Sequence, residues 1–202
     1  MSLSADHFRR TLVTALATLP VSGIAAASGS GGEQRRAGSR TLVAYFSRTG
    51  NTLVIAGLIH RSLNTDLFEI RPAAPYPEEY LATVEQAQQE RDSGRERALQ
   101  ARVSNMKDYD TVFLGFPIWG ETTPPVIRAF LSAHDLSGRT LIPFITHGGY
   151  GLGSSQSVLA SHAPRAKLRS PFVMEADQER RTMNSVNEWL NVTGLTRVFG
   201  AA

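Results

Sequence analysis

Three short segments of the chain carry residue types that suit ligand binding, and each follows a run of apolar residues. They are the segments 47–52, 117–123 and 147–153. The first, Ser47-Arg-Thr-Gly-Asn-Thr52, precedes a helix-forming pattern, so hydroxyls and unpaired backbone N–H groups would meet at a helix N-terminus. Such donors can bind a phosphate without a lysine. A well-capped helix uses the same residue types, so this loop alone leaves both interpretations open.

The first loop lacks two familiar nucleotide-binding motifs. It does not end in Gly-Lys-Ser/Thr, which disfavours ATP hydrolysis. No Gly-x-Gly-x-x-Gly follows the preceding apolar run, so the dinucleotide fingerprint is missing as well.

The second and third loops add aromatic side chains and glycines. Gly115-Phe-Pro-Ile-Trp-Gly120 places a tryptophan just after an apolar run, although a lone tryptophan more often packs in a core or lid. Thr146-His-Gly-Gly-Tyr-Gly151 would let backbone amides lie against a flat ligand, or form an irregular turn. His147 could tune a redox potential, but a structural bond within the turn is favoured. Together the three loops predict a phosphorylated planar cofactor.

Alternating strand and helix patterns would position these loops. Strands are expected at 41–46, 66–70, 111–116, 140–146 and 168–174, and helices at 53–63, 78–90, 125–133, 154–163 and 182–192. This alternation predicts an α/β fold with a doubly wound, five-stranded parallel sheet and helices on both faces. Ligands bind such sheets beyond the carboxyl ends of the strands, where the three loops would gather.

The first 40 residues differ from the rest of the chain. Arg9 and Arg10 precede an apolar run from Leu12 to Ala27, which predicts residues 1–28 to be an export signal resembling the twin-arginine type. The protein would then be periplasmic, with a cytoplasmic location as the alternative. Residues 29–40 would form a flexible linker and residues 41–202 the cofactor-binding domain. The apolar run is too short and interrupted to predict stable membrane insertion.

Charge and composition exclude several classes of function. Residues 1–40 hold five of the 21 basic and two of the 18 acidic side chains, so residues 41–202 hold 16 of each. This balance argues against nucleic acid as a partner. The chain has no cysteine, which excludes thiolate metal sites and a cysteine nucleophile. We expect the charged segment 91–97 to be a solvated face and His134 to lie at the surface.

The three loops resemble the FMN-binding segments of the flavodoxin family. Tyr45-Phe-Ser-Arg-Thr-Gly-Asn-Thr52 is the most diagnostic of them. Pro75-Tyr-Pro-Glu-Glu-Tyr80 and Gln86-Ala-Gln-Gln-Glu90 are similar to a subgroup of bacterial flavodoxin-like proteins. The resemblance runs from about Thr41 to Gly194, and it implies a flavodoxin-like sheet of strand order 2-1-3-4-5 with FMN as the cofactor.

The resemblance also implies which residues contact FMN. The phosphate would be bound by the hydroxyls of Ser47, Thr49 and Thr52 and by the backbone amides of Arg48, Gly50 and Asn51. The ring would be bordered on one side by Pro117, Ile118, Trp119 and Gly120, and on the other by Thr146, His147, Gly148, Gly149, Tyr150 and Gly151. In that family a peptide of the second loop turns over when the flavin is reduced, and Gly120 would permit this.

The function implied is electron transfer through the bound flavin, with a redox partner protein or a small donor or acceptor that the sequence does not identify. A flavin-dependent NAD(P)H or quinone reductase and a non-redox module for a phosphate ester are the alternatives. A hydrolase using Ser154 or Ser155 with His147 is disfavoured because the Gly-x-Ser-x-Gly elbow is missing.

Overall fold

A computed structural model describes residues 41–175, 186 and 188–194. The strands are β1 (Thr41–Tyr45), β2 (Asp66–Glu69), β3 (Thr111–Pro117), β4 (Thr140–His147), β5 (Lys167–Leu168) and β6 (Phe172–Glu175). The helices are α1 (Asn51–Leu63), α2 (Tyr80–Asp92), the 3-10 turn η1 (Met106–Asp108), α3 (Pro125–Ala133) and α4 (Ser155–His162). The predicted export signal and linker lie outside the described residues, as does part of the predicted last helix.

The sheet has the predicted topology. Its strands follow the order β2-β1-β3-β4-β5, and the strand pairings within the described residues are all parallel. Because parallel strands point the same way, the loops after β1, β3 and β4 meet at one edge. The predicted flavodoxin-like α/β fold is therefore confirmed.

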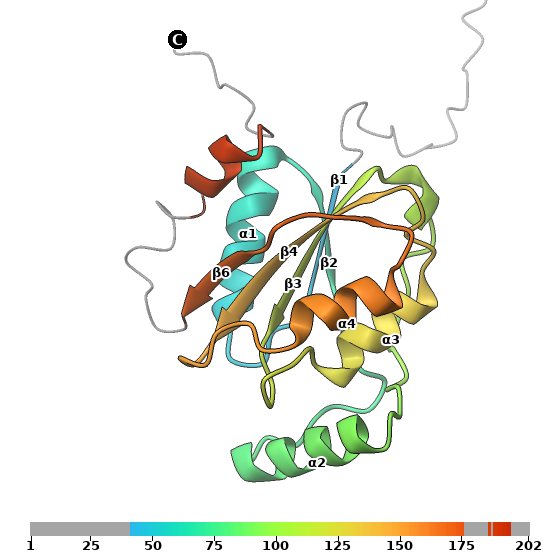
Figure 1. Cartoon of the computed structure of the whole chain (residues 1–202), viewed down its shortest axis with the longest axis vertical. Helices are drawn as coiled ribbons and strands as arrows, with labels where there is room; N and C mark the ends of the chain where they lie inside the picture. Colours follow the sequence, from blue (N-terminus) through green and yellow to red (C-terminus); the bar gives the residue numbers. More distant parts are fainter. Residues whose placement is uncertain (1–40, 176–185, 187, 195–202) are drawn as a thin grey trace, which may run out of the picture. The chain divides into compact units, whose positions relative to one another are not determined.

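Helices cover both faces of the sheet, and the alternation of side chains along the strands explains how (Figure 1). One face packs Leu42, Ala44, Val112 and Leu114 against residues of α3 and α4. The intervening side chains form a second buried cluster with α1, Val186 and Leu190. The strands read as nearly continuous apolar runs because both of their faces are buried.

The fifth strand is interrupted, which differs from the single strand expected at 168–174. β5 pairs with Thr140 and Leu141, whereas β6 pairs with residues 144–147 of β4. Pro143 lies on β4 opposite the break, and Pro171 lies between β5 and β6. A proline has no N–H to give to a strand ladder, so the pairing stops and resumes beyond it.

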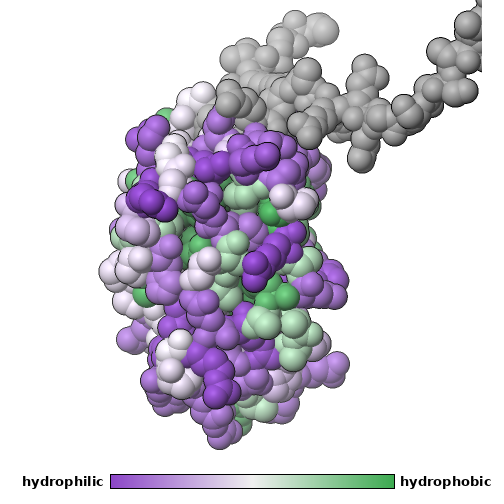
Figure 2. Space-filling model, turned by 90° about the vertical axis from the view of Figure 1, so that its right-hand side faces the viewer, coloured by the Kyte–Doolittle hydropathy of each residue, from purple (hydrophilic) through white to green (hydrophobic). Residues whose placement is uncertain are grey.

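The surface is mainly hydrophilic on the face drawn in Figure 2, with small separate hydrophobic patches. Most large apolar side chains are instead in the two buried clusters. No helix within the described part of the chain has the length and apolar character that crossing a membrane requires.

His134 is buried, so the expectation of a surface position was wrong. Its Nδ1 donates to the carbonyl oxygen of Phe130 at 2.8 Å, and its Nε2 accepts the N–H of Val103 at 3.0 Å. The ring can make both bonds only when it is neutral. Burial lowers the pKa of His134, and nearby Arg102 lowers it further.

The protein is expected to lose stability in acid through His134. Because the pKa is lower in the folded state, the unfolded chain binds this proton first, so the stability present above about pH 6.5 falls as the pH drops below it. Urea unfolding at pH 7.5 and 5.5 measures how much the free energy of unfolding falls between the two pH values. In His134→Gln this fall should be smaller, by no more than the binding of one proton can contribute. An equal loss in both proteins would contradict this assignment.

Candidate functional site

The first loop lies between β1 and the N-terminus of α1 and opens onto free space. Gly50 is the N-cap residue of α1, with a φ of 95° that glycine adopts without strain. A Cβ at this position would meet no atom within 4 Å. The Oγ of Ser47 accepts the N–H of Gly50 at 3.1 Å, which closes the loop into a turn.

The start of α1 suits a phosphate group. A helix cannot satisfy its first N–H groups internally, and its dipole makes this end positive. The first turn of α1 has no acidic side chain, and within the described residues no side chain caps it. The backbone N–H groups and hydroxyls of the loop therefore supply donors for an anion, with no carboxylate in that turn to repel it.

Thr52 links the first loop to β4. Its Oγ1 lies 2.9 Å from the Oγ1 of Thr146, and both residues are buried. When Thr146 donates this bond, Thr52 keeps its own proton for an acceptor in front of the helix. Thr146 thus fixes the position of the Thr52 side chain, and its own contact with a cofactor ring stays a prediction.

The second loop is a tight turn at the end of β3. The N–H of Ile118 donates to the carbonyl oxygen of Thr146 at 2.8 Å, and Trp119 and Thr122 exchange two backbone bonds of 3.0 and 3.2 Å. The two residues between them, Gly120 and Glu121, have φ values of 55° and 61°. Gly120 adopts such a φ without strain, as expected for glycine. Glu121 has a backbone conformation that favours glycine, so this residue is strained.

The third loop is organised by His147. Its Nδ1 accepts the N–H groups of Gly149 at 3.1 Å and Gly151 at 3.3 Å. This is the structural role within a turn that the sequence favoured, made to amides instead of a carbonyl. A Cβ added at Gly148 or Gly151 would meet nothing within 4 Å, and Tyr150 is 80% exposed. The loop therefore presents backbone and one free aromatic ring to the surface.

The second and third loops pack against each other, backbone to backbone. The N–H of Ser154 donates to the carbonyl oxygen of Glu121 at 2.9 Å, and its Oγ donates to the Oγ1 of Thr122 at 2.8 Å. A Cβ at Gly153 would lie 1.8 Å from the same Glu121 oxygen. Ser154 is thus occupied in joining the loops, and Ser155 is fully buried, so neither serine offers the free, accessible hydroxyl that the hydrolase alternative requires.

Trp119 belongs to an aromatic cluster, which we define as Phe46, Tyr76 and Trp119. The Trp119 ring meets Phe46 at 5.2 Å and Tyr76 at 4.8 Å between centroids, both nearly edge to face. Phe46 is buried, and the other two rings are partly buried against the core. One side of Trp119 is therefore fixed by protein.

Arg48 does not turn its side chain to the phosphate loop. Its guanidinium donates to the carbonyl oxygen of Glu78 at 2.7 Å and lies 5.8 Å from the centre of the Tyr80 ring. Only its backbone amide remains for the role that the resemblance implies. The side chain instead connects the first loop to the start of α2.

Sequence reasoning missed several residues around the aromatic cluster. Arg97 was expected on a solvated face, but its side chain is 9% exposed and is paired with Glu90. Arg91 donates to the carbonyl oxygen of Gly120 at 3.4 Å. Two motifs could have pointed to these residues. The segments around Tyr76 and from Gln86 to Glu90 resemble a family pattern, but the resemblance assigns them no role.

A family model described as Flavodoxin matches residues 40–193 of the chain. A search of curated proteins returned no match.

Among the solved structures that share the fold are three flavoproteins. A candidate flavoprotein from Bacteroides eggerthii is 31% identical, with 77% of this chain and 98% of that chain covered and a TM-score of 0.67. One from Bacteroides uniformis is 28% identical, with coverage of 76% and 99% and a TM-score of 0.68. A flavoprotein from Lactobacillus acidophilus, crystallised with FMN, is 18% identical, with coverage of 72% and 99% and a TM-score of 0.58.

Proposed function

Because this chain belongs to the flavodoxin family, we propose that it binds FMN at the ends of β1, β3 and β4 and transfers electrons through the bound flavin. The observation that carries the proposal is the open N-terminus of α1. Gly50 there leaves room for an anion, and no side chain of the described residues caps the first-turn amides of α1. The flavin supplies the redox chemistry, while the protein supplies position and electrostatics.

The residues of this chain divide the binding between them. Ser47, Thr49 and Thr52 would donate hydroxyl hydrogen bonds to the phosphate, together with the amides of Arg48 and Asn51. The amide of Gly50 would join them by leaving the Ser47 hydroxyl, to which it donates in this structure. The second and third loops would border the ring with Trp119 and with the peptide groups of the glycine-rich turn. Gly120 holds its positive φ without strain, so the peptide group between Gly120 and Glu121 would reorient at the cost of the bond that Arg91 makes to the Gly120 carbonyl oxygen.

The absorption spectrum of the purified full-length protein with FMN tests this proposal. Binding should shift and structure the visible flavin bands, and reduction followed by reoxidation should restore them. Steady consumption of NAD(P)H in the presence of a quinone would assign the protein as a reductase, and the lack of such turnover would favour an electron carrier. A spectrum identical to that of free FMN would contradict both assignments.

Trp119→Ala is expected to weaken FMN binding about 3- to 10-fold, which is the size of one aromatic contact. It should also shift the flavin reduction potential, because a polar solvent replaces an apolar wall beside the ring. Trp119→Phe keeps an aromatic face and should restore much of both properties. Unchanged affinity and potential in the alanine variant would place the ring elsewhere.

A further inference from the structure

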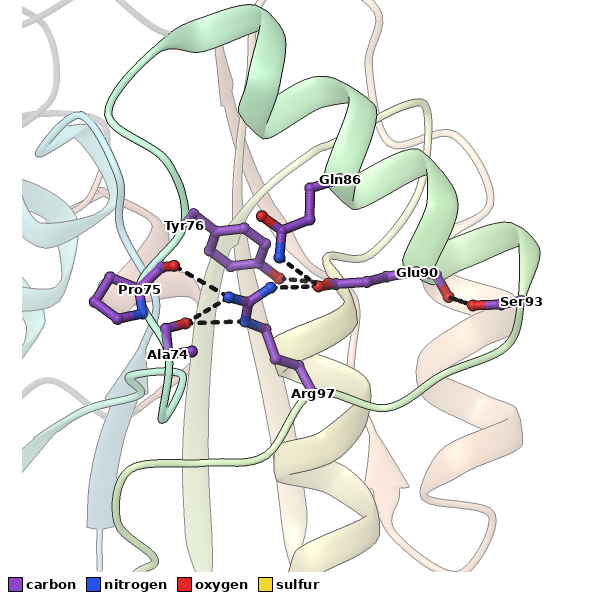
Figure 3. A network of polar contacts seen from close by, with 7 residues as sticks. All are labelled: Ala74, Pro75, Tyr76, Gln86, Glu90, Ser93 and Arg97. Carbon is purple, nitrogen blue, oxygen red and sulfur yellow. Dashed lines mark hydrogen bonds and ion pairs between the residues drawn. The ribbon is translucent and has the colours of Figure 1, made fainter.

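Tyr76 is held in place by a partly buried polar network (Figure 3). The Arg97 guanidinium lies 4.1 Å from the centre of the Tyr76 ring. It donates to the carbonyl oxygens of Ala74 and Pro75, each at 3.1 Å, from two of its nitrogens. Its remaining nitrogen pairs with the Glu90 carboxylate. Arg97 thus contacts both the Tyr76 ring and the backbone of the two residues that precede Tyr76.

Glu90 completes the network from α2. Its carboxylate accepts the hydroxyl of Tyr76 at 3.2 Å and the side-chain amide of Gln86 at 3.0 Å. Burial raises the pKa of Tyr76, and the negative charge of Glu90 raises it further, so the hydroxyl stays protonated as a donor. Removing one partner of a buried ion pair is strongly destabilising locally, because the other charge is left unpaired.

The network reaches the proposed flavin site through the contact between Tyr76 and Trp119. Arg97 covers the face of Tyr76, and Tyr76 meets Trp119 at an interplanar angle of 80°. The segment that carries Tyr76 and the segment that carries Arg97 are also joined by two backbone hydrogen bonds of 2.8 Å. The N–H of Ala73 donates to the carbonyl oxygen of Ala98, and the N–H of Gln100 donates to that of Arg71. Tyr76 therefore cannot turn away from Trp119 without breaking the contacts of Arg97.

We propose that Arg97 is a positioning residue for the flavin ring: it holds Tyr76 against Trp119 and so fixes the wall on which the ring would pack. The inference rests on the proposed function and assigns a role to the Tyr76 and Gln86–Glu90 motifs. Arginine suits this position because its planar fork can stack and make several directed bonds at once, which lysine cannot.

The apo protein provides a test that needs no flavin. In a Trp189→Phe background, the fluorescence of Trp119 is quenched by acrylamide. Arg97→Met is expected to raise the quenching constant about twofold or more, and Arg97→Lys to raise it less, because the charge near Glu90 remains. Arg95→Met is the matched control, since Arg95 is exposed on the same segment. Thermal unfolding identifies variants that are not folded. If Arg97→Met does not fold, the quenching constant of Arg97→Lys tests the proposal in its place.

The flavin-bound protein provides the second measurement. Arg97→Lys and Arg97→Met should weaken FMN and riboflavin by the same factor, because the phosphate loop is intact, and should shift the reduction potential in the direction of Trp119→Ala. Unchanged quenching in the folded Arg97 variants, or an equal change in Arg95→Met, would overturn the inference. If the parent protein bound no flavin, the proposed function would fail, while the quenching result would still decide whether Arg97 holds Trp119.

Discussion

Replacing Gly50 by aspartate is expected to abolish FMN binding, with a loss of affinity on the order of 100-fold or more. The physical reason is charge. The new carboxylate would enter the space before the first turn of α1, where the doubly anionic phosphate would bind, and no protein atom lies within 4 Å of its Cβ. Calorimetric titration with FMN measures the loss.

Asparagine at position 50 is the matched control. Asn and Asp have the same shape and tolerate a positive φ similarly well, so Gly50→Asn separates backbone strain and size from charge. We expect it to weaken binding by about 10-fold at most, since the anion repulsion is missing. Equal losses in the two variants would mean that the loop does not receive an anion.

Gly153→Ala is expected to lower the free energy of unfolding by about 2–4 kcal/mol, because it adds a steric clash to a backbone conformation that favours glycine. Its Cβ would lie 1.8 Å from the carbonyl oxygen of Glu121, which already accepts the N–H of Ser154. To relieve the clash, the second and third loops must separate, so FMN affinity should fall as well. Urea unfolding and FMN titration measure the two effects.

Gly94→Ala controls for the backbone strain alone. Gly94 has a φ of 63°, close to the 51° of Gly153, and a Cβ there would meet no atom within 4 Å. Its substitution should cost about 1 kcal/mol. If Gly153→Ala were no more destabilising than Gly94→Ala, the two loops would not be packed as described.

The fold could be predicted because its signals are local. Apolar runs at 41–46 and 111–116 mark strands buried on both faces, and the loops after them gather wherever parallel strands end. The break between β5 and β6 also had a sequence signal, Pro171, but the opposing Pro143 matters only once the two strands are paired.

Two side chains were harder to predict, Arg97 beside the proposed site and His134 at the end of α3, because their partners are distant in sequence or beyond a helix end. Arg97 is buried only because the chain turns back after α2 and brings Glu90 and the Tyr76 segment to it. His134 is buried because Val103, 31 residues earlier, gives its N–H to the ring. The periodicity of apolar residues within one helix predicts neither of these contacts, because each joins residues that do not lie in the same helix.

The most direct test of the central claim compares FMN with riboflavin in calorimetric titrations of the purified protein. The two ligands share the ring and differ in the phosphate. The account predicts one FMN bound per chain and at least about 100-fold weaker binding of riboflavin, because the amides and hydroxyls at the start of α1 would have no anion to bind. Equal affinities, or no heat with FMN, would contradict it.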